Sequence, residues 1–352
     1  MAGLWLRLWF DRLFSGAQDA RNRGDNGESV RAEYDFSKPR SRKNPYATKL
    51  NRQSSPTTQL RRKTFLAIAI LAVVGVIADL AVGQLLTTPA QRTIGPAPAD
   101  LDAENVAFES SVGPISGWLI HGSRPIGSIL LLHGVRSNRK QMVPRARWLK
   151  QLGYSVLLID LPAHGESPGN HITFGYNESK AVDASLVFLH REFPQQPVGV
   201  IGVSLGAAST VLAKPVEPPS AVVLESMYPT IGDAVSDRLS LRFGRAGPYL
   251  APLLLWQIPF RLDISTKDLR PKDHLRNRGF AILIASGSKD AHTRIAEAKS
   301  IYLSASPPKE FWQVDGAAHV DLFDYDPESY KHHVGPFLRK YLPARPITEP
   351  SD

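Results

Sequence analysis

Gly202-Val203-Ser204-Leu205-Gly206 is the stretch of sequence that decides the fold. It follows an apolar, largely β-branched run, Val198 to Val203, and precedes two small helix-forming residues, Ala207 and Ala208. A strand that passes directly into a helix places Ser204 on a sharp turn, where the two glycines remove Cβ atoms that would collide. The stretch therefore predicts a serine hydroxyl presented at the end of a strand, the position of a nucleophile.

The chain around this motif alternates between short apolar runs and helical stretches. Apolar runs with no polar alternation are typical of strands that helices cover on both faces. The pattern predicts an α/β fold with a doubly wound, mostly parallel, eight-stranded sheet and a site at the carboxyl ends of its strands. Strands are predicted at Asn105–Glu109, Ile115–His121, Ser128–Leu132, Ser155–Asp160, Val198–Val203, Ala221–Glu225, Ala281–Ser286 and Lys309–Val314, and helices at about 141–152, 178–193, 205–213, 294–305 and 327–342.

One connection breaks this regular spacing. Residues 226–280 lie between two predicted strands and include an apolar stretch, 248–260, that is too short to span a bilayer. So long a connection is usually functional, which favours a helical cap that lines an acyl pocket or touches lipid. The alternative is a set of packing helices remote from the site.

An apolar run of 22 residues, Phe65–Leu86, is long enough to cross a membrane. Residues 36–63 before it carry nine Lys and Arg and no acid, whereas acidic residues predominate after it. This asymmetry predicts a signal anchor at 65–86 with a cytoplasmic N-terminus and an extracytoplasmic catalytic domain, periplasmic or extracellular. A buried core helix is the alternative. Asp79 inside the run is interpreted as an interfacial residue reached by water, with a polar contact between helices as the alternative.

The remaining segments are assigned by composition. Residues 1–64 are predicted to form a basic, largely disordered cytoplasmic tail attracted to anionic lipid. Its first part, Met1–Phe14, is amphipathic, which leaves three interpretations open: it lies on the inner membrane surface, packs as a short helix on a partner, or is disordered. A Pro-rich linker covers 87–104, the catalytic domain 105–343, and a C-terminal tail 344–352.

Charge and cysteine content exclude several functions. The net charge is +9, but residues 1–87 hold +7 of it, so the globular part is nearly neutral and no nucleic-acid partner is expected. The chain has no cysteine, which excludes thiol catalysis and cysteine-based metal sites. The histidines and acids show no compact ligand spacing, so no metal site is expected.

Attack by a serine on an acyl group needs a base and an acid that orients the base. His319, in Gly316-Ala317-Ala318-His319, directly follows the last predicted strand, and Asp290 follows the preceding one. Both residues therefore belong on loops at the carboxyl edge of the sheet, where Ser204 also lies. Glu225, at the end of the strand after the motif, is the alternative acid.

The loop after Leu132 is predicted to complete the site. In His133-Gly134-Val135, the backbone N–H of Val135 joins that of Leu205 as an oxyanion hole, while Gly134, Gly202 and Gly206 shape the turn. His133 is expected to brace this loop rather than transfer protons. His164 is the main competitor of His319 as base, but its loop precedes the nucleophile. The other histidines are interpreted as surface or packing residues: His121, His171, His190, His274, His292, His332 and His333.

Together, His133-Gly134, Asp160 to Ser167, Gly202 to Gly206, Asp290 and Gly316 to His319 resemble the α/β-hydrolase superfamily, and within it the serine aminopeptidase-like and BEM46-like hydrolases. The resemblance spans about residues 105–343. It implies a triad of Ser204, Asp290 and His319 that hydrolyses esters, thioesters or amides without a cofactor. Ala163 stands where relatives usually carry glycine, and Ala291-His292-Thr293 replaces the usual turn after the acid.

The expected partners are the lipid bilayer and a small acyl ester or short peptide, and the sequence leaves protein partners open. Three functions remain open: an esterase or thioesterase with an acyl-enzyme on Ser204, a serine aminopeptidase acting on short peptides, and an inactive binding module of the same fold. The apolar stretch at 248–260 favours the acyl ester. An aminopeptidase would need an acid to hold the peptide amine, for which Asp233, Asp237, Asp263, Asp268 and Asp273 are available.

Overall fold

Strands that are apolar on both faces form the centre of the molecule, in a computed structural model that describes residues 56–124 and 126–342. Within these residues, eight strands make one sheet in the order β10-β9-β8-β7-β4-β5-β3-β2. The six from β10 to β5 run parallel, and β3 and β2 continue the sheet antiparallel. The strands are β2 (Glu104–Ser110), β3 (Gly113–Ile120), β4 (Ser128–Leu132), β5 (Ser155–Ile159), β7 (Val198–Val203), β8 (Ala221–Glu225), β9 (Ala281–Gly287) and β10 (Lys309–Val314).

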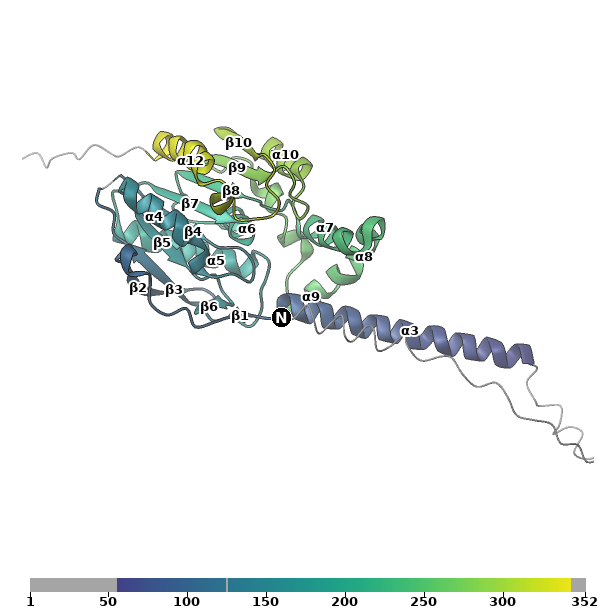
Figure 1. Ribbon diagram of the computed structural model, residues 1–352. Helices are drawn as coiled ribbons and strands as arrows, with labels where there is room; N and C mark the ends of the chain where they lie inside the picture. The colour runs from purple at the N-terminus through teal and green to yellow at the C-terminus, as the bar shows by residue number, and fades with distance from the viewer. Residues whose placement is uncertain (1–55, 125, 343–352) are drawn as a thin grey trace, which may run out of the picture. The chain divides into compact units, whose positions relative to one another are not determined.

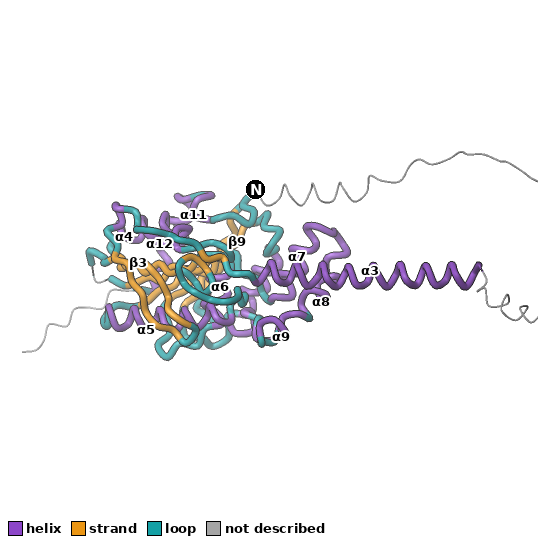
Figure 2. Tube along the Cα trace, turned by 90° about the horizontal axis from the view of Figure 1, so that it is seen from below, coloured by secondary structure: helices purple, strands orange, loops and turns teal. Residues whose placement is uncertain are grey.

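Helices cover both faces of this sheet (Figure 1). One core layer includes α5 (Tyr176–Glu192), α6 (Leu205–Leu212) and α10 (Ile295–Ser304). The other includes α4 (Val143–Leu152), α11 (Leu322–Tyr325) and α12 (Pro327–Tyr341). Figure 2 shows the strands gathered between the helices. The predicted fold class, a mostly parallel sheet in an α/β architecture, is confirmed.

The connection between β8 and β9 is helical. It contains α7 (Ile231–Phe243), α8 (Gly247–Leu255) and α9 (Gln257–Leu262), followed by short 3-10 turns. A small apolar cluster of its own holds it together, with Ile231 from α7 and Ile258 from α9. We call α7, α8 and α9 the cap.

The predicted membrane segment is one long helix, α3 (Pro56–Thr87). The helix begins before the predicted start at residue 65, so residues 56–64, expected to be part of a disordered tail, are helical. Pro56 suits a first helical position, because its missing N–H would have no partner there. α3 is long and apolar enough to cross a membrane, and its most apolar window is not covered by the rest of the protein. The predictions for residues 1–55 and for the tail at 344–352 lie outside the described residues.

Asp79 makes the contact that was the less favoured alternative. Its carboxylate Oδ2 accepts hydrogen bonds from Trp256 Nε1 at 3.1 Å and Gln257 Nε2 at 2.8 Å, both at the start of α9. The polar contact between helices is therefore present, and the position of Asp79 near a bilayer interface stays a prediction.

The segment predicted as a linker is fastened to the domain. Ala90–Gln91 (β1) pairs in parallel with His164–Gly165 (β6). The N–H groups of Ile94 and Gly95 donate to Glu166 Oε1 at 2.9 and 3.1 Å. A β pairing of two residues leaves no periodic pattern in the sequence, which is why composition alone indicated a free linker.

A buried ion cluster joins α4, the end of β8, the loop before α11 and α12. Arg145 on α4 contacts Glu225 Oε2 at 2.6 Å and Asp321 Oδ1 at 2.8 Å. Tyr330 on α12 donates to Glu225 Oε1 at 2.6 Å. The side chains of Arg145 and Glu225 are completely buried, so each charge depends on the other for compensation.

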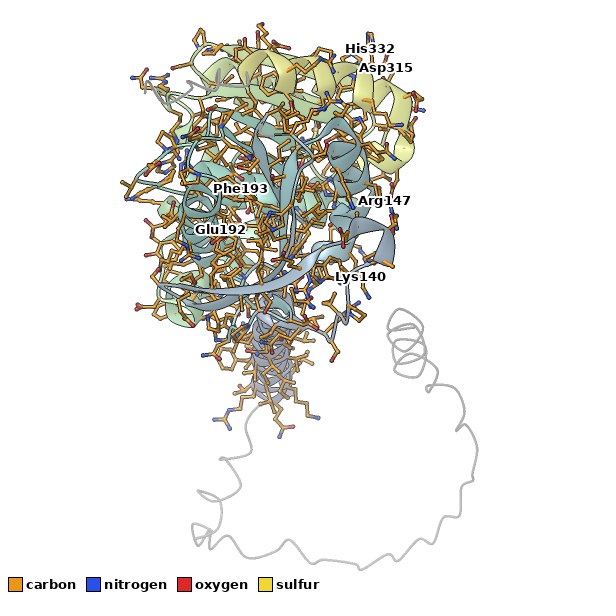
Figure 3. All side chains as sticks on the ribbon, turned by 90° about the vertical axis from the view of Figure 1, so that its left-hand side faces the viewer. Lys140, Arg147, Glu192, Phe193, Asp315 and His332 are labelled. Atoms are coloured by element: carbon orange, nitrogen blue, oxygen red, sulfur yellow. The ribbon has the colours of Figure 1, made fainter. Side chains whose placement is uncertain are left out.

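We expect Arg145→Ala to lower the free energy of unfolding by about 3–5 kcal/mol, because it leaves Glu225 buried without its counter-charge. Urea unfolding of the full chain in detergent micelles measures this loss. Arg147→Ala is the matched control on the same helix, since Arg147 pairs with Asp100 at the surface and lies at the edge of the domain in Figure 3. Equal effects of the two substitutions would contradict the prediction.

Candidate active site

Ser204 lies on the turn between β7 and α6, with φ of 51° and ψ of −101°. This left-handed backbone is costly for a residue with a side chain, and such strain is typical of functional turns. Two close approaches explain the flanking glycines. A Cβ on Gly202 would come within 2.6 Å of Ala207 N, and one on Gly206 within 2.6 Å of Leu132 Cβ. The sharp turn predicted from the sequence is therefore present.

Asp290 and His319 meet at the ends of neighbouring strands. Asp290 follows β9, His319 follows β10, and His319 Nδ1 lies 2.8 Å from Asp290 Oδ2. The other carboxylate oxygen accepts from the N–H groups of His292 and Thr293 at 2.8 and 2.9 Å. The unusual Ala291-His292-Thr293 turn thus supplies two donors that hold the acid in place.

These contacts set the charge of Asp290. Burial alone would raise the pKa of its carboxyl, but the hydrogen bond and the attraction of His319, with the two amides, outweigh burial and lower it. The carboxylate is thus ionised at neutral pH and can orient the imidazole of His319 through Nδ1.

Ser204 and His319 line one cavity of about 370 Å³. Among the described residues no hydrogen bond joins Ser204 Oγ to the imidazole, while the His319–Asp290 bond is formed. Catalytic hydrogen bonds are often long in a site without substrate and tighten in the complex. The structure brings the three predicted residues together and leaves the Ser204–His319 contact open.

The two predicted oxyanion donors flank the serine. Leu205 is the first residue of α6, where helix N–H groups have no partner within the helix. Val135 lines the same cavity as Ser204. Gly134 N donates to Gln141 Oε1 at 2.9 Å, which fixes the loop that carries Val135. Within the described residues, neither the Val135 nor the Leu205 N–H donates to another backbone group.

His133 is buried beside this loop. Its Nε2 accepts from Leu161 N at 3.0 Å, which leaves Nδ1 to donate to Gly134 O at 2.7 Å. Burial, assisted by the nearby His164, lowers the pKa of His133 to about 3, so the ring is neutral. Through these contacts His133 braces the loop, and it lines neither of the two cavities that reach Ser204.

The alternative base and acid lie elsewhere. His164 is buried, and its Nδ1 lies 2.9 Å from Pro162 O. Glu225 contacts Arg145 and Tyr330 rather than His319. Ala163 takes φ of 62°. Glycine, which relatives usually carry here, adopts this conformation without strain, whereas alanine adopts it at a cost of about 1 kcal/mol. The loop that holds Ala163 is thus compatible with the substitution.

Two cavity residues carried no sequence signal. His292, interpreted as a surface or packing residue, lines the cavity with its ring 5.0 Å from that of His319. Arg238 on α7 lines both this cavity and a second one. No motif marks either residue, since the cap brings Arg238 to the site only in the folded chain.

The second cavity, of about 230 Å³, also reaches Ser204 and is largely apolar. Its walls include Phe174, Tyr228, Ile231 and Val235, with Leu86 from the end of α3. This position of the cap agrees with a cap over the site and not with packing helices remote from it.

Arg238 is a cation facing both cavities. Its Nη1 donates to Ala234 O at 2.9 Å, and no carboxylate among the described residues lies within ion-pair distance of it. Burial lowers the pKa of its guanidinium, against the opposing attraction of Tyr228, Asp290 and Asp237. None of the five cap acids considered for binding a peptide amine lines either cavity.

In the part of the chain that the structure describes, no group of three or more His, Asp or Glu residues is placed to hold a metal ion.

Comparisons with known proteins agree with this geometry. A family model described as serine aminopeptidase, S33, matches residues 123–247, a region that includes Ser204 and ends before Asp290. The esterase Pf2001 from Pyrococcus furiosus is 25% identical, with a TM-score of 0.58 over 72% of this chain and 99% of that one. The chain therefore has the α/β-hydrolase fold.

Two more distant relatives, one of them a solved structure, are also similar to this chain. An acylaminoacyl peptidase from Pyrococcus horikoshii is 16% identical over 70% of this chain and 43% of that one, with a TM-score of 0.53. The curated protein YqkD from Bacillus subtilis, described as uncharacterized, is 18% identical over 64% of this chain and 75% of its own length.

We expect Asp290→Asn to lower kcat for a soluble test ester by about 10³- to 10⁴-fold, because an amide cannot hold the same His319 tautomer. Hydrolysis of 4-methylumbelliferyl butyrate by the full chain in micelles measures this. Asp237→Asn is the control, because Asp237 is a buried acid on α7 that lines neither cavity. A small effect of Asp290→Asn, or a similar loss in the control, would contradict the assignment.

Proposed function

We propose that the protein is a membrane-anchored serine hydrolase that cleaves carboxylic ester or thioester bonds through an acyl-enzyme on Ser204. The observation that carries the proposal is the 2.8 Å contact of His319 Nδ1 with Asp290, in a cavity that a serine on a strained strand-to-helix turn also lines. The matched family model and the esterase neighbour support hydrolysis.

The reaction follows from these positions. As Ser204 Oγ attacks the acyl carbon, His319 Nε2 takes its proton and Asp290 stabilises the imidazolium. The oxyanion forms next to the N–H groups of Val135 and Leu205. The bond to the leaving alcohol or thiol breaks as His319 returns the proton to it. Water, deprotonated by the same imidazole, then releases the acid and restores Ser204.

Cavity chemistry favours an ester over a peptide with a free amine. The guanidinium of Arg238 would repel an ammonium group, and the apolar second cavity suits an acyl chain. Asp321 lines the first cavity but is paired with Arg145 at 2.8 Å. A site for an amine would need a carboxylate free of such a partner.

The proposed anchor is α3, with its N-terminal side in the cytoplasm and the catalytic domain outside. The length and exposure of the helix support a membrane span, and Arg61, Arg62 and Lys63 near its start support the orientation.

Labelling with a fluorophosphonate probe tests the nucleophile. Wild-type protein should be labelled, and Ser204→Ala should not be, because the probe reacts only with an activated serine. Labelling that persists in Ser204→Ala, or that is missing from folded wild type, would refute the assignment. A panel of acyl esters and aminoacyl amides then separates the two substrate classes, with esters expected to be hydrolysed faster.

Topology has its own test. Alkaline phosphatase fused after Ser110 should be active, because it matures only outside the cytoplasm. An inactive fusion that is expressed at normal levels would place the catalytic domain on the cytoplasmic side instead.

A further inference from the structure

The carboxyl-terminal end of α3 is fastened to the cap. Besides the two hydrogen bonds to Asp79 described above, Arg261 Nη2 donates to Leu80 O at 3.0 Å, and Arg261 also contacts the side chain of Gln84. Gln257 lies so close to Gly83 that a Cβ there would come within 2.2 Å of Gln257 Oε1. Figures 1 and 2 both show α9 beside this end of α3.

An exposed apolar row runs along the cap and ends at this contact. Tyr249, Leu253, Trp256 and Phe260 are 84%, 55%, 47% and 82% exposed. Their spacing of four, three and four residues places them on one helical face, and Trp256, with φ of −61° and ψ of −23°, carries the helical path from α8 into α9. We call these four residues the apolar row.

The length of α3 indicates what covers the row. A helix rises 1.5 Å per residue, so a hydrocarbon core of about 30 Å takes about 20 residues. Counted from the basic residues at 61–63, that length ends near Gly83, beyond the point where Trp256 contacts Asp79. Tilting of the helix moves this boundary further along the chain. Trp256, which belongs both to the row and to the contact with α3, therefore lies just inside the hydrocarbon boundary, next to the interface where Trp and Tyr are favoured.

An apolar path leads from this place to Ser204. The second cavity next to Ser204 shares Leu86, Phe174, Ile231 and Val235 with a narrower gap between α3 and the cap. Leu254, Leu255 and Ile258 of the cap line the gap further out. Apolar walls therefore continue from the serine to the seam between α3 and α9.

We propose that the apolar row is immersed in the outer leaflet and that the acyl chain of a membrane lipid ester enters between α3 and α9 to reach Ser204. The inference rests on the proposed function and narrows its substrate to acyl esters held in the bilayer. The reaction at Ser204 is the one described under the proposed function, with the alcohol portion of the lipid as the leaving group.

Depth in the bilayer is measured without any activity. The full chain is reconstituted in phosphatidylcholine vesicles whose acyl chains carry bromine, which quenches nearby indoles. The quenched part of the emission should fall in Trp256→Phe and remain in Trp312→Phe, because Trp312 is buried in the domain core. Identical quenching of wild type and Trp256→Phe would overturn the proposal.

Substrate entry is tested with the double variant Tyr249→Ser, Phe260→Ser, whose side chains line neither cavity next to Ser204. In vesicles, kcat/KM for 4-methylumbelliferyl palmitate should fall at least tenfold, while the rate with the water-soluble butyrate and the fluorophosphonate labelling stay unchanged. The matched control is Val187→Ser, Leu303→Ser, which removes two exposed apolar side chains from α5 and α10.

Unchanged palmitate hydrolysis, or an equal loss with both esters, would overturn the proposal. Failure of the proposed function would give a different result, because wild type would then show neither labelling nor butyrate hydrolysis. The quenching of Trp256 does not depend on either activity.

Discussion

The buried guanidinium of Arg145 is the interaction on which the site depends. It forms ion pairs with Glu225, whose own carbonyl oxygen accepts the N–H of Ser204 at 2.8 Å, and with Asp321, which lies two residues after His319. One cation thus links the strand beside the serine turn to the loop of the proposed base. Because a buried charge without its partner is costly, these two parts of the site cannot separate without a large penalty.

The central strands β4, β5, β7, β8 and β9 were predictable because each is a short, mainly apolar run bounded by polar residues or turns. β4, β7, β8 and β10 begin and end where the sequence predicted. Ser204, Asp290 and His319 followed from topology, since a parallel sheet gathers the loops after its strands at one edge. Arg145 and Arg238 left no such sign, because their partners or cavities come from segments far away in the chain.

The errors at the N-terminal side have a different cause. Hydropathy marks the part of a helix that fits lipid, not the residues where the helix starts, so residues 56–64 of α3 were missed. The helix contact of Asp79 was not the preferred interpretation for a related reason, since its partners Trp256 and Gln257 lie 177 and 178 residues further along the chain. A charged residue in an apolar run indicates that a polar partner exists, but the sequence does not show which residue it is.

The pairing of Ala90–Gln91 with His164–Gly165 begins three residues after α3 ends. So short a connection prevents the proposed anchor and the loop that follows β5 from moving independently. A catalytic domain held in this way would keep a constant height and orientation above its own membrane. It would work on what the surrounding leaflet delivers by lateral diffusion, and an acyl group in an opposing membrane would stay out of its reach.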